Sequence, residues 1–529
     1  MSKDNFVKGA AILSIAGLVV KILGAIYKIP LTNLITQEGI GYFQPAYNVY
    51  NLLLAMSLVG FPTAIARLVS EKRALNNHLG AQQIYSVSLW TLFVVGVVTS
   101  VLTLLLARPI VNLMGYPKSY YSLIALVPAL LVIPILSAYR GFFQGTQNMV
   151  PIAISQILEQ VFRVVVGLIL AYSLVDYGIE KAAAGATFGA SIGGIIALIV
   201  MFTFFMMRKK LTQNEIDSAV NNKLDTNKNV VNSILAIAIP ITIGASIAPV
   251  IGVLDGAIVA NRLDALGYLE KEIAVLYGHL STAHTIINFP QAFSTAIAMS
   301  LVPVITEAFT KKDKARLNEI SGAGIKISLI LALPCGVGMF MLATPLVQLL
   351  FSIVGDELAT TGLLLSILSI SVIFLILVQA FTAILQSVNK QMVPVKNLFI
   401  GLIIKVILSF VLISIPTINI KGAALSTGGA YFVVAVLNYI DIKRYTTIKT
   451  DSIIKIAALP LLSTAIMAVA VGLTYYVGGL LITGKILTLL SVMVGGIVYS
   501  VALFATGTIN SKDLELIPMG NKLKKFVRK

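Results

Sequence analysis

The sequence contains little charge and few of the residues that build disulfides or metal centres. Charged side chains make up 12% of its 529 residues, which is about half the share found in soluble proteins. The single cysteine, Cys335, excludes an internal disulfide. Only three histidines are present, and no Cys or His cluster has the spacing of metal ligands. The sequence therefore does not predict a soluble domain, a disulfide-stabilised secreted protein or a metalloprotein.

Long apolar runs take the place of the missing charge. Hydrophobic residues make up 57% of the chain, and runs of about twenty residues, each long enough to cross a bilayer, recur along its whole length. We predict an all-α polytopic membrane protein with about fourteen transmembrane helices. Their predicted ranges are 6–29, 41–68, 84–107, 121–143, 151–175, 183–207, 231–257, 281–308, 321–343, 361–386, 397–415, 422–441, 453–477 and 486–506.

Acidic residues are scarce, and the excess of basic residues has a pattern. The chain holds 39 Lys and Arg against 22 Asp and Glu, a formal net charge of +17. Most basic residues fall in alternate loops and in both tails, including "RKK" at 208–210 and "KLKKFVRK" at 522–529. This asymmetry follows the positive-inside rule, so we expect both termini in the cytoplasm. Membrane lipids, and not nucleic acid, are the expected partners of the basic tail.

The two halves of the chain repeat each other. "KAAAGATFGA" at 181–190 and "KGAALSTGGA" at 421–430 share Lys, Ala, Ala, Thr, Gly and Ala in register, and Pro151 and Pro394 both end a matching "MVP". A parallel repeat relates two lobes by an axis along the membrane normal, with a substrate site between them. The predicted parts are two pseudo-twofold-related six-helix lobes at 1–210 and 230–445, a cytoplasmic linker at 211–229, a helix pair at 446–510 and a basic cytoplasmic tail at 511–529.

Polar side chains inside the first two predicted spans are candidates for substrate binding, because charge in hydrocarbon is costly. Lys21 and Lys28 lie seven residues apart, which places them on one helical face about 10 Å apart. Gln44, Asn48 and Asn51 form a polar stripe on the second span. We predict that the two lysines face a solvated cavity. For Lys28 the alternative is a side chain that extends to the membrane interface.

The predicted helices near 151–175 and 231–257 carry further charged candidates. Glu159 precedes Arg163 by one turn, the favourable order for an ion pair within a helix. This pair either holds the lobe together or contacts the substrate. Asp255 and Arg262 lie two turns apart, too far to touch, so each needs a partner elsewhere. We consider Asp255 a candidate for ion coupling, or for pairing with a lysine of the first helix.

The predicted helix at 281–308 contributes His284 as a candidate. The charges inside the predicted spans, taken together, indicate whether the substrate is anionic or cationic. His284 is either a buried structural histidine or a substrate contact, and its helix is expected to break at Pro290. Intramembrane Lys and Arg outnumber the acids Glu159, Asp255 and Glu307. A cationic cavity suits an anionic substrate, since phosphate is bound by Lys point charges and Arg forks.

Three segments carry a resemblance to a known family: "FVKGAAILSIAGLVVKILGAIYKIPLTNLI" at 6–35, "YGHLSTAHTIINFPQAFSTAIAMSLVP" at 277–303 and "LILALPCGVGMF" at 329–340. The chain resembles the MurJ/SpoVB/YtgP-type polysaccharide transporters of the multidrug/oligosaccharidyl-lipid/polysaccharide exporter superfamily. The resemblance covers nearly the whole chain. It implies a fourteen-helix fold and alternating-access flipping of an undecaprenyl-pyrophosphate-linked sugar, with lipid II as the first candidate, across a bacterial cytoplasmic membrane. It also implies that the helix pair at 446–510 forms a groove for the lipid tail.

The same resemblance suggests positions for the site. Lys21 falls where the family has a cavity arginine of helix one, and Lys28 lies close to a second such position. The helix-two segment "NLLLAM" lacks an arginine that some members carry there. Near "INFP", His284 or Thr285 stands where the family has an arginine. The cationic positions are thus only partly kept.

Three functions remain open. The first is a flippase for lipid II, or for another envelope or spore-cortex polysaccharide precursor. The second is a drug or cation exporter of the same superfamily, which is expected to carry acidic residues in its cavity. The third is a membrane enzyme, which needs a catalytic cluster and a larger extramembrane loop than this sequence has. The intramembrane charge favours the flippase. We therefore expect a monomeric transporter, not an enzyme, that needs no cofactor and is coupled to the membrane potential or to a monovalent ion.

Overall fold

A computed structural model describes residues 3–217, 223–445, 453–482 and 484–508. This part of the chain is helical and contains no strand. Thirteen helical stretches within it are long and apolar enough to cross a membrane. The first of them, Ile15–Ala74, is 60 residues long, about three times what one crossing requires. The predicted all-α polytopic fold with about fourteen spans is confirmed. The predicted basic tail at 511–529 lies outside the described residues.

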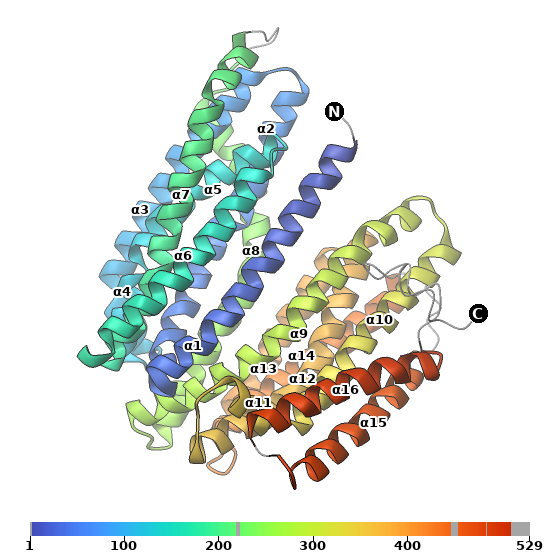
Figure 1. Ribbon diagram of the computed structural model, residues 1–529. Coiled ribbons are helices and arrows are strands. Elements are labelled where there is room, and N and C mark those ends of the chain that lie inside the picture. The colour runs from blue at the N-terminus through green and yellow to red at the C-terminus, as the bar shows by residue number, and fades with distance from the viewer. Residues whose placement is uncertain (1–2, 218–222, 446–452, 483, 509–529) are drawn as a thin grey trace. The chain divides into compact units, whose positions relative to one another are not determined.

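The chain forms two compact units, Met1–Gly278 and His279–Lys529. Their longer helices appear in Figure 1. The first unit contains α1 (Lys3–Leu58), α2 (Gly60–Ala74), α3 (His78–Leu113), η1 (Pro117–Ser119), α4 (Tyr120–Ala125), α5 (Val127–Gly145), α6 (Val150–Leu174), η2 (Val175–Tyr177), α7 (Ile179–Asp217), α8 (Asn227–Ala265) and the first turns of α9 (Glu270–Thr310). The second contains the rest of α9, α10 (Lys314–Met341), α11 (Ala343–Leu350), α12 (Gly355–Ser387), α13 (Met392–Ile413), α14 (Lys421–Tyr445), α15 (Ile453–Gly478) and α16 (Lys485–Ala505).

The predicted lobe boundaries differ from the limits of these units. Helix α8 and the start of α9 pack with the first unit, whereas the repeat assigns them to the second lobe at 230–445. A compact unit contains the helices that touch in one conformation, whereas a repeat reflects the order of the sequence. The boundaries predicted from the repeat stay a prediction.

Helix α1 consists of two helices joined at Thr36, which has φ 60°. Lys28 Nζ lies 2.6 Å from Gln44 Oε1, although the two residues are 16 positions apart. In a straight helix that separation would be about 24 Å, so the chain must fold back between them. The turn brings Lys28 of the first predicted polar face against Gln44 of the second, within the first unit.

Prolines inside α9 do not end it. The helix runs from Glu270 to Thr310 with Pro290 and Pro303 inside, so the predicted break at Pro290 is wrong. An internal proline removes one backbone hydrogen bond and bends a helix, but neighbouring helices can hold the bent segment in place.

Helices α6 and α7 pack closely through glycines. A Cβ added at Gly189 would overlap the carbonyl oxygen of Arg163, and one at Gly193 would overlap that of Glu159. Small residues four apart let membrane helices approach to backbone contact. This contact fixes the height and rotation of α6, and with them the positions of its glutamate and arginine.

Each unit repeats the same two turns between helices. At the first turn a residue with positive φ precedes an Asn or Asp that caps the next helix through its side chain. At the second turn a residue with φ of 58° or 60° follows the end of a helix. The matching positions are Asn76 and Lys312, Asn77 and Asp313, and Gln147 and Asn389. These shared turns agree with the sequence repeat.

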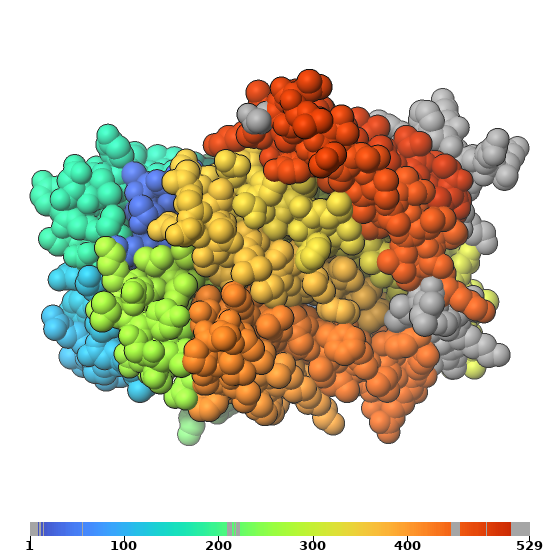
Figure 2. Space-filling view, turned by 90° about the horizontal axis from the view of Figure 1, so that it is seen from below, coloured from blue at the N-terminus to red at the C-terminus, as the bar shows by residue number. Residues whose placement is uncertain are grey.

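The C-terminal helix pair, α15 and α16, forms an outer layer of the second unit (Figure 2). Met467 and Val471 of α15 form a small core with Tyr499 and Leu503 of α16. Tyr499 Oη donates a hydrogen bond of 2.8 Å to the carbonyl oxygen of Ile330 in α10. Outward-facing side chains of both helices, such as Leu473 and Ile497, are exposed, as expected where lipid surrounds a helix.

Candidate transport site in the first unit

A chain of hydrogen bonds follows the polar stripe of α1. Lys28 Nζ donates to Gln44 Oε1 at 2.6 Å, and Gln44 Nε2 donates to Asn48 Oδ1 at 2.7 Å. Asn48 Nδ2 donates to the carbonyl oxygen of Gly252 in α8 at 2.9 Å and to Tyr277 Oη at 3.1 Å. Lys28 therefore lies against a polar face of the protein, and this favours the internal position over the membrane-interface alternative.

A cavity of about 410 Å³ lies next to this chain of hydrogen bonds. Asn48 and Asn51 supply its polar side chains. The apolar part of its wall consists of Leu54, Ala55, Leu58, Val59, Ala245, Ala248, Pro249 and Gly252. A mostly apolar cavity with a few placed polar groups is typical of a ligand site. The structure thus brings both predicted asparagines to one cavity and connects it to Lys28 through Gln44.

A buried ion-pair network joins α5, α6 and α1. Glu159 accepts hydrogen bonds of 2.8 Å from both Arg140 and Arg163, and the three side chains are only 14%, 9% and 13% exposed. Arg163 Nη1 also donates to Tyr47 Oη at 3.1 Å. Among the described residues, Nε of Arg163 is buried and has no hydrogen-bond partner. Two guanidinium groups share one carboxylate, so the network carries a net positive charge.

Arg140 is a member of this network that the sequence analysis missed. It stands near the end of an apolar run, in "SAYRGFFQG", where an arginine commonly anchors a helix at the membrane interface. Its partners, Glu159 and Ser155, lie on the next long helix, 19 and 15 residues further on. The only signal in the sequence is an arginine inside a predicted span. The i,i+4 pairing of Glu159 with Arg163 is confirmed.

The two charged candidates on α8 differ in position. Asp255 is only 8% exposed and lies within electrostatic range of Tyr116 and Tyr277. Arg262 lies in the last turn of α8, where a cation interacts favourably with the helix dipole. This position explains Arg262 as a helix-end residue. The pairing of Asp255 with a lysine of α1 stays a prediction.

The remaining candidates are Lys21 and His284. Lys21 is exposed on α1, so its side chain reaches a surface of the first unit. His284 belongs to the second unit, is half-buried, and its Nδ1 lies 2.9 Å from the carbonyl oxygen of Leu280. A ring nitrogen bonded to the preceding turn of its own helix fits the structural reading of this histidine. The roles of both residues in transport stay predictions.

Opposite the end of the unit where α1 begins, α1 meets α9 at two glycines. A Cβ added at Gly41 would overlap the carbonyl oxygen of Ala274, and one added at Gly278 would overlap that of Gln37. We call these four residues the α1–α9 seam. No side chain larger than hydrogen fits at either glycine without separating the two backbones.

The fold defines the class of protein. The structure resembles an inward-facing multidrug resistance MATE family transporter of the MOP superfamily, with a TM-score of 0.67 at 14% identity over 84% of this chain and 99% of that one. It equally resembles the inward closed conformation of the lipid II flippase MurJ, with a TM-score of 0.68 at 17% identity over 92% and 97% of the two chains. The fold is that of the MOP exporters.

The family follows from the sequence comparison. The chain belongs to the polysaccharide biosynthesis protein family, which matches residues 6–309, and the MatE family matches residues 278–411. In Bacillus subtilis (strain 168), the lipid II flippase MurJ is 28% identical over 99% of both chains. The stage V sporulation protein B of the same organism is 28% identical over 84% of this chain and 85% of its own length. The recognition of a MurJ- and SpoVB-like transporter is confirmed.

Proposed function

We propose that this chain flips an undecaprenyl-pyrophosphate-linked cell-wall precursor, with lipid II as the first candidate, across the bacterial cytoplasmic membrane. The observation that carries the proposal is the buried cationic network of Arg140, Glu159 and Arg163. The partnerless Nε of Arg163 is a donor suited to a phosphate oxygen, because buried donors are normally satisfied. The similarity to a lipid II flippase over nearly the whole chain supports the same substrate class.

In this proposal Lys28 and Arg163 bind the pyrophosphate, while Asn48 and Asn51 contact the sugar in the cavity. Lysine and arginine suit phosphate for different reasons: lysine acts as a point charge and arginine as a fork. Asparagine side chains offer both donors and acceptors to sugar hydroxyls. A shallow groove along α16, lined by Met493, Gly496, Ile497, Ser500 and Val501, supports a path for the lipid tail.

The proposed transport cycle is alternating access, with cytoplasmic termini. Under the positive-inside rule, the α1–α9 seam lies near the outer face and closes the exit. Opening it requires the α1–α9 contact and the Asn48 bonds to Gly252 and Tyr277 to separate. Alternating access by rocking of two repeats predicts such a reversible contact on each side of the substrate.

The test replaces Lys28 in cells depleted of their own lipid II flippase. The wild-type chain is expected to expose labelled lipid II to a membrane-impermeant enzyme that cleaves its headgroup. We expect Lys28→Ala to reduce that exposure about tenfold, because a hydrogen bond to a charged group contributes about 1.5–3 kcal/mol. Lys181→Ala, at an exposed position of α7, is the matched control. Lipid II that stays protected in cells making the wild-type chain would overturn the proposed substrate.

A drug or cation exporter is the second candidate, because the MatE family matches residues 278–411. The same cells separate the two functions. An exporter is expected to lower the accumulation of a cationic dye such as ethidium while lipid II remains protected. The flippase is expected to do the reverse. Flippases for other envelope or spore-cortex precursors would restore neither readout and would expose a different labelled lipid-linked glycan.

The predicted pairing of Asp255 with a lysine of α1 has its own test. If an ion pair between Asp255 and Lys21 stabilises one conformation of the transport cycle, the pyrophosphate of the substrate can compete for the lysine and release the protein from that conformation. Lys21→Asp and Asp255→Lys are each expected to lower transport severely, and the double exchange is expected to recover part of it. A double variant no more active than the worse single variant would contradict the pairing.

A further inference from the structure

Residues 223–225, just before α8, are bound to α2, α3 and the turn between them at several points. Lys72 Nζ lies 2.5 Å from Asp225 Oδ2. Gln83 Nε2 donates to the carbonyl oxygen of Asp225 at 2.6 Å, and the amide N–H of Asp225 donates to Gln83 Oε1 at 3.1 Å. Asn77 Nδ2 donates to the carbonyl oxygen of Lys223 at 2.6 Å. Residues 223–225 of the predicted linker are thus docked on the turn between α2 and α3.

Glu215 docks the other end of the segment. Its carboxylate accepts hydrogen bonds of 2.7 and 3.2 Å from the two terminal nitrogens of Arg73. Arg208 Nη2 lies 3.7 Å away, and His78 Nδ1 lies 3.8 Å away. The hydrogen bond from Arg73 holds the pKa of Glu215 below its ordinary value, so Glu215 is ionised at neutral pH. Within the described part of the chain, this carboxylate therefore lies among three basic side chains.

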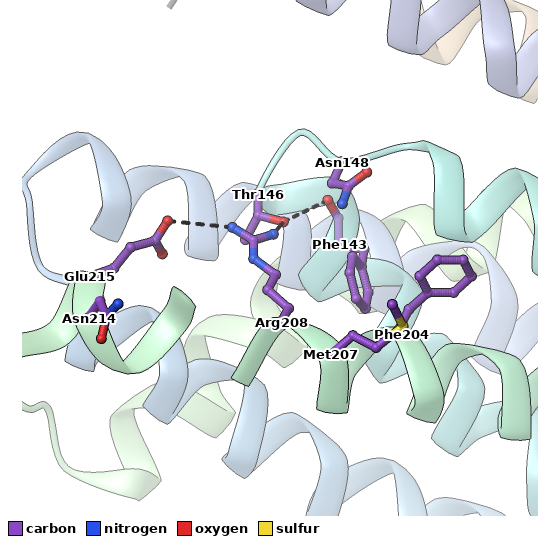
Figure 3. A pocket seen from close by; sticks show the side chains of 8 residues that line it. All are labelled: Phe143, Thr146, Asn148, Phe204, Met207, Arg208, Asn214 and Glu215. Atoms are coloured by element: carbon purple, nitrogen blue, oxygen red, sulfur yellow. Dashed lines mark hydrogen bonds and ion pairs between the residues drawn. The ribbon is translucent and has the colours of Figure 1, made fainter. Parts of the chain in front are cut away.

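An open pocket of about 610 Å³ adjoins this carboxylate. Figure 3 shows Arg208 between two kinds of lining: Phe143, Phe204 and Met207 to one side, Asn214 and Glu215 to the other. Arg208 Nη1 donates to Thr146 Oγ1 at 2.7 Å. The pocket therefore has an apolar wall and a polar wall that meet at the guanidinium of Arg208.

We propose that this pocket binds the phosphate headgroup of an anionic membrane phospholipid, and that the lipid competes with Glu215 for Arg208 and Arg73. Bound lipid then loosens the docked linker. The site is distinct from the Arg140–Glu159–Arg163 network and does not depend on which substrate the chain transports.

Three observations favour a lipid over a soluble anion. Arg208 directly follows the apolar run predicted to cross the membrane at 183–207 and opens the basic sequence "RKK" at 208–210, which is expected to lie at headgroup depth on the cytoplasmic side. Met207 is exposed and shares the pocket wall with Phe204, so an acyl chain can pack beside a phosphate bound at Arg208. The segment "RKKLTQNE" at 208–215 holds three basic residues and one acid, a bias that attracts anionic lipid at the cytoplasmic face.

If the lipid and Glu215 compete for the same arginines, replacing Glu215 and replacing Arg208 must change lipid binding in opposite directions. Removing the internal carboxylate leaves the guanidinium groups of Arg208 and Arg73 to the lipid, so Glu215→Gln is expected to tighten lipid binding. Removing the guanidinium takes away the phosphate partner, so Arg208→Gln is expected to weaken it. Because coupling between two binding equilibria is reciprocal, the lipid must weaken linker docking by the same factor by which linker docking weakens lipid binding.

The experiment uses the full-length protein purified in zwitterionic phosphatidylcholine nanodiscs, with phosphatidylglycerol added stepwise. Native mass spectrometry measures retained phosphatidylglycerol, and hydrogen exchange of residues 223–227 measures linker docking. We expect phosphatidylglycerol to raise that exchange about fivefold or more. Glu215→Gln is expected to retain more lipid than wild type, Arg208→Gln less, and Arg208→Lys an intermediate amount.

Arg67→Gln is the matched control, because Arg67 pairs with Glu71 at an exposed position of α2 away from the pocket. Equal lipid retention by Arg67→Gln and Arg208→Gln would overturn the site. Phosphatidylglycerol that slows exchange at 223–227 would overturn the competition. Inorganic phosphate that raises the exchange as much as the lipid does would overturn the assignment to a phospholipid. If Arg208→Gln folds poorly, Glu215→Gln serves as the test variant. Unchanged lipid retention by Glu215→Gln would contradict the proposal.

Discussion

Replacing Gly41 with valine is expected to block transport while the protein still reaches the membrane. A Cβ at this position would overlap the carbonyl oxygen of Ala274, an overlap that forces the two backbones apart. Overpacking of this kind costs about 1–3 kcal/mol in well-packed interiors. Only the state in which the seam is closed bears that cost, so the balance of states shifts about fivefold or more toward the open seam.

Cysteine labelling measures this shift directly. Ala274 is fully buried in the closed seam, and Cys335 is the only native cysteine. In a Cys335→Ser background, the Ala274→Cys variant is expected to resist a membrane-impermeant thiol reagent unless Gly41→Val is also present. Gly17→Val is the control, because an added Cβ at Gly17 of α1 meets nothing within 4 Å. Wild-type transport together with a shielded thiol at position 274 in the Gly41→Val variant would refute the seam as a moving contact.

The fold was largely predictable because a membrane imposes one simple rule. Each span needs about twenty apolar residues with all backbone groups bonded internally, so run lengths alone predicted the helices. The single-residue turn at Thr36 and the continuous passage of α9 through Pro290 depend on neighbouring helices. Composition does not report such neighbours, and a proline has the same local meaning whether or not a second helix supports the bend.

The site was predictable only where its contacts are local. Glu159 and Arg163 are one turn apart, so the sequence contains their pairing. Arg140 meets Glu159 across two helices, and Asn48 meets Gly252 from 204 positions away. Likewise, Gln83 binds Asp225 across 142 positions, a contact that the predicted linker at 211–229 did not include. Long-range polar contacts leave no spacing in the sequence from which they can be inferred.

Replacing Glu159 with glutamine is expected to destabilise the first unit severely. The change leaves Arg140 and Arg163 buried beside each other without their shared carboxylate. Breaking a buried ion pair by removing one partner costs about 3–5 kcal/mol, because a charge then remains uncompensated in a low-dielectric interior. Thermal unfolding of the purified protein measures the effect as a lower midpoint. Replacing Arg140 as well, as Arg140→Met with Glu159→Met, removes one cation and its partner together and is expected to recover part of the loss.

The exposed pair of Arg67 and Glu71 provides the matched control. It has the same i,i+4 spacing as Glu159 and Arg163 on a different helix, but its side chains are 65% and 52% exposed. Exposed pairs contribute about 0–1 kcal/mol, so Glu71→Gln is expected to unfold close to wild type. If Glu159→Gln unfolds at the same midpoint as Glu71→Gln, the network does not stabilise the fold. A loss of transport in that variant would then mean that the charge of the network serves substrate binding alone. A different outcome is that Glu159→Gln lowers both stability and transport, and that Arg140→Met with Glu159→Met restores only stability. In that case the positive charge of Arg163 does not suffice for transport, and Arg140 itself contacts the anion.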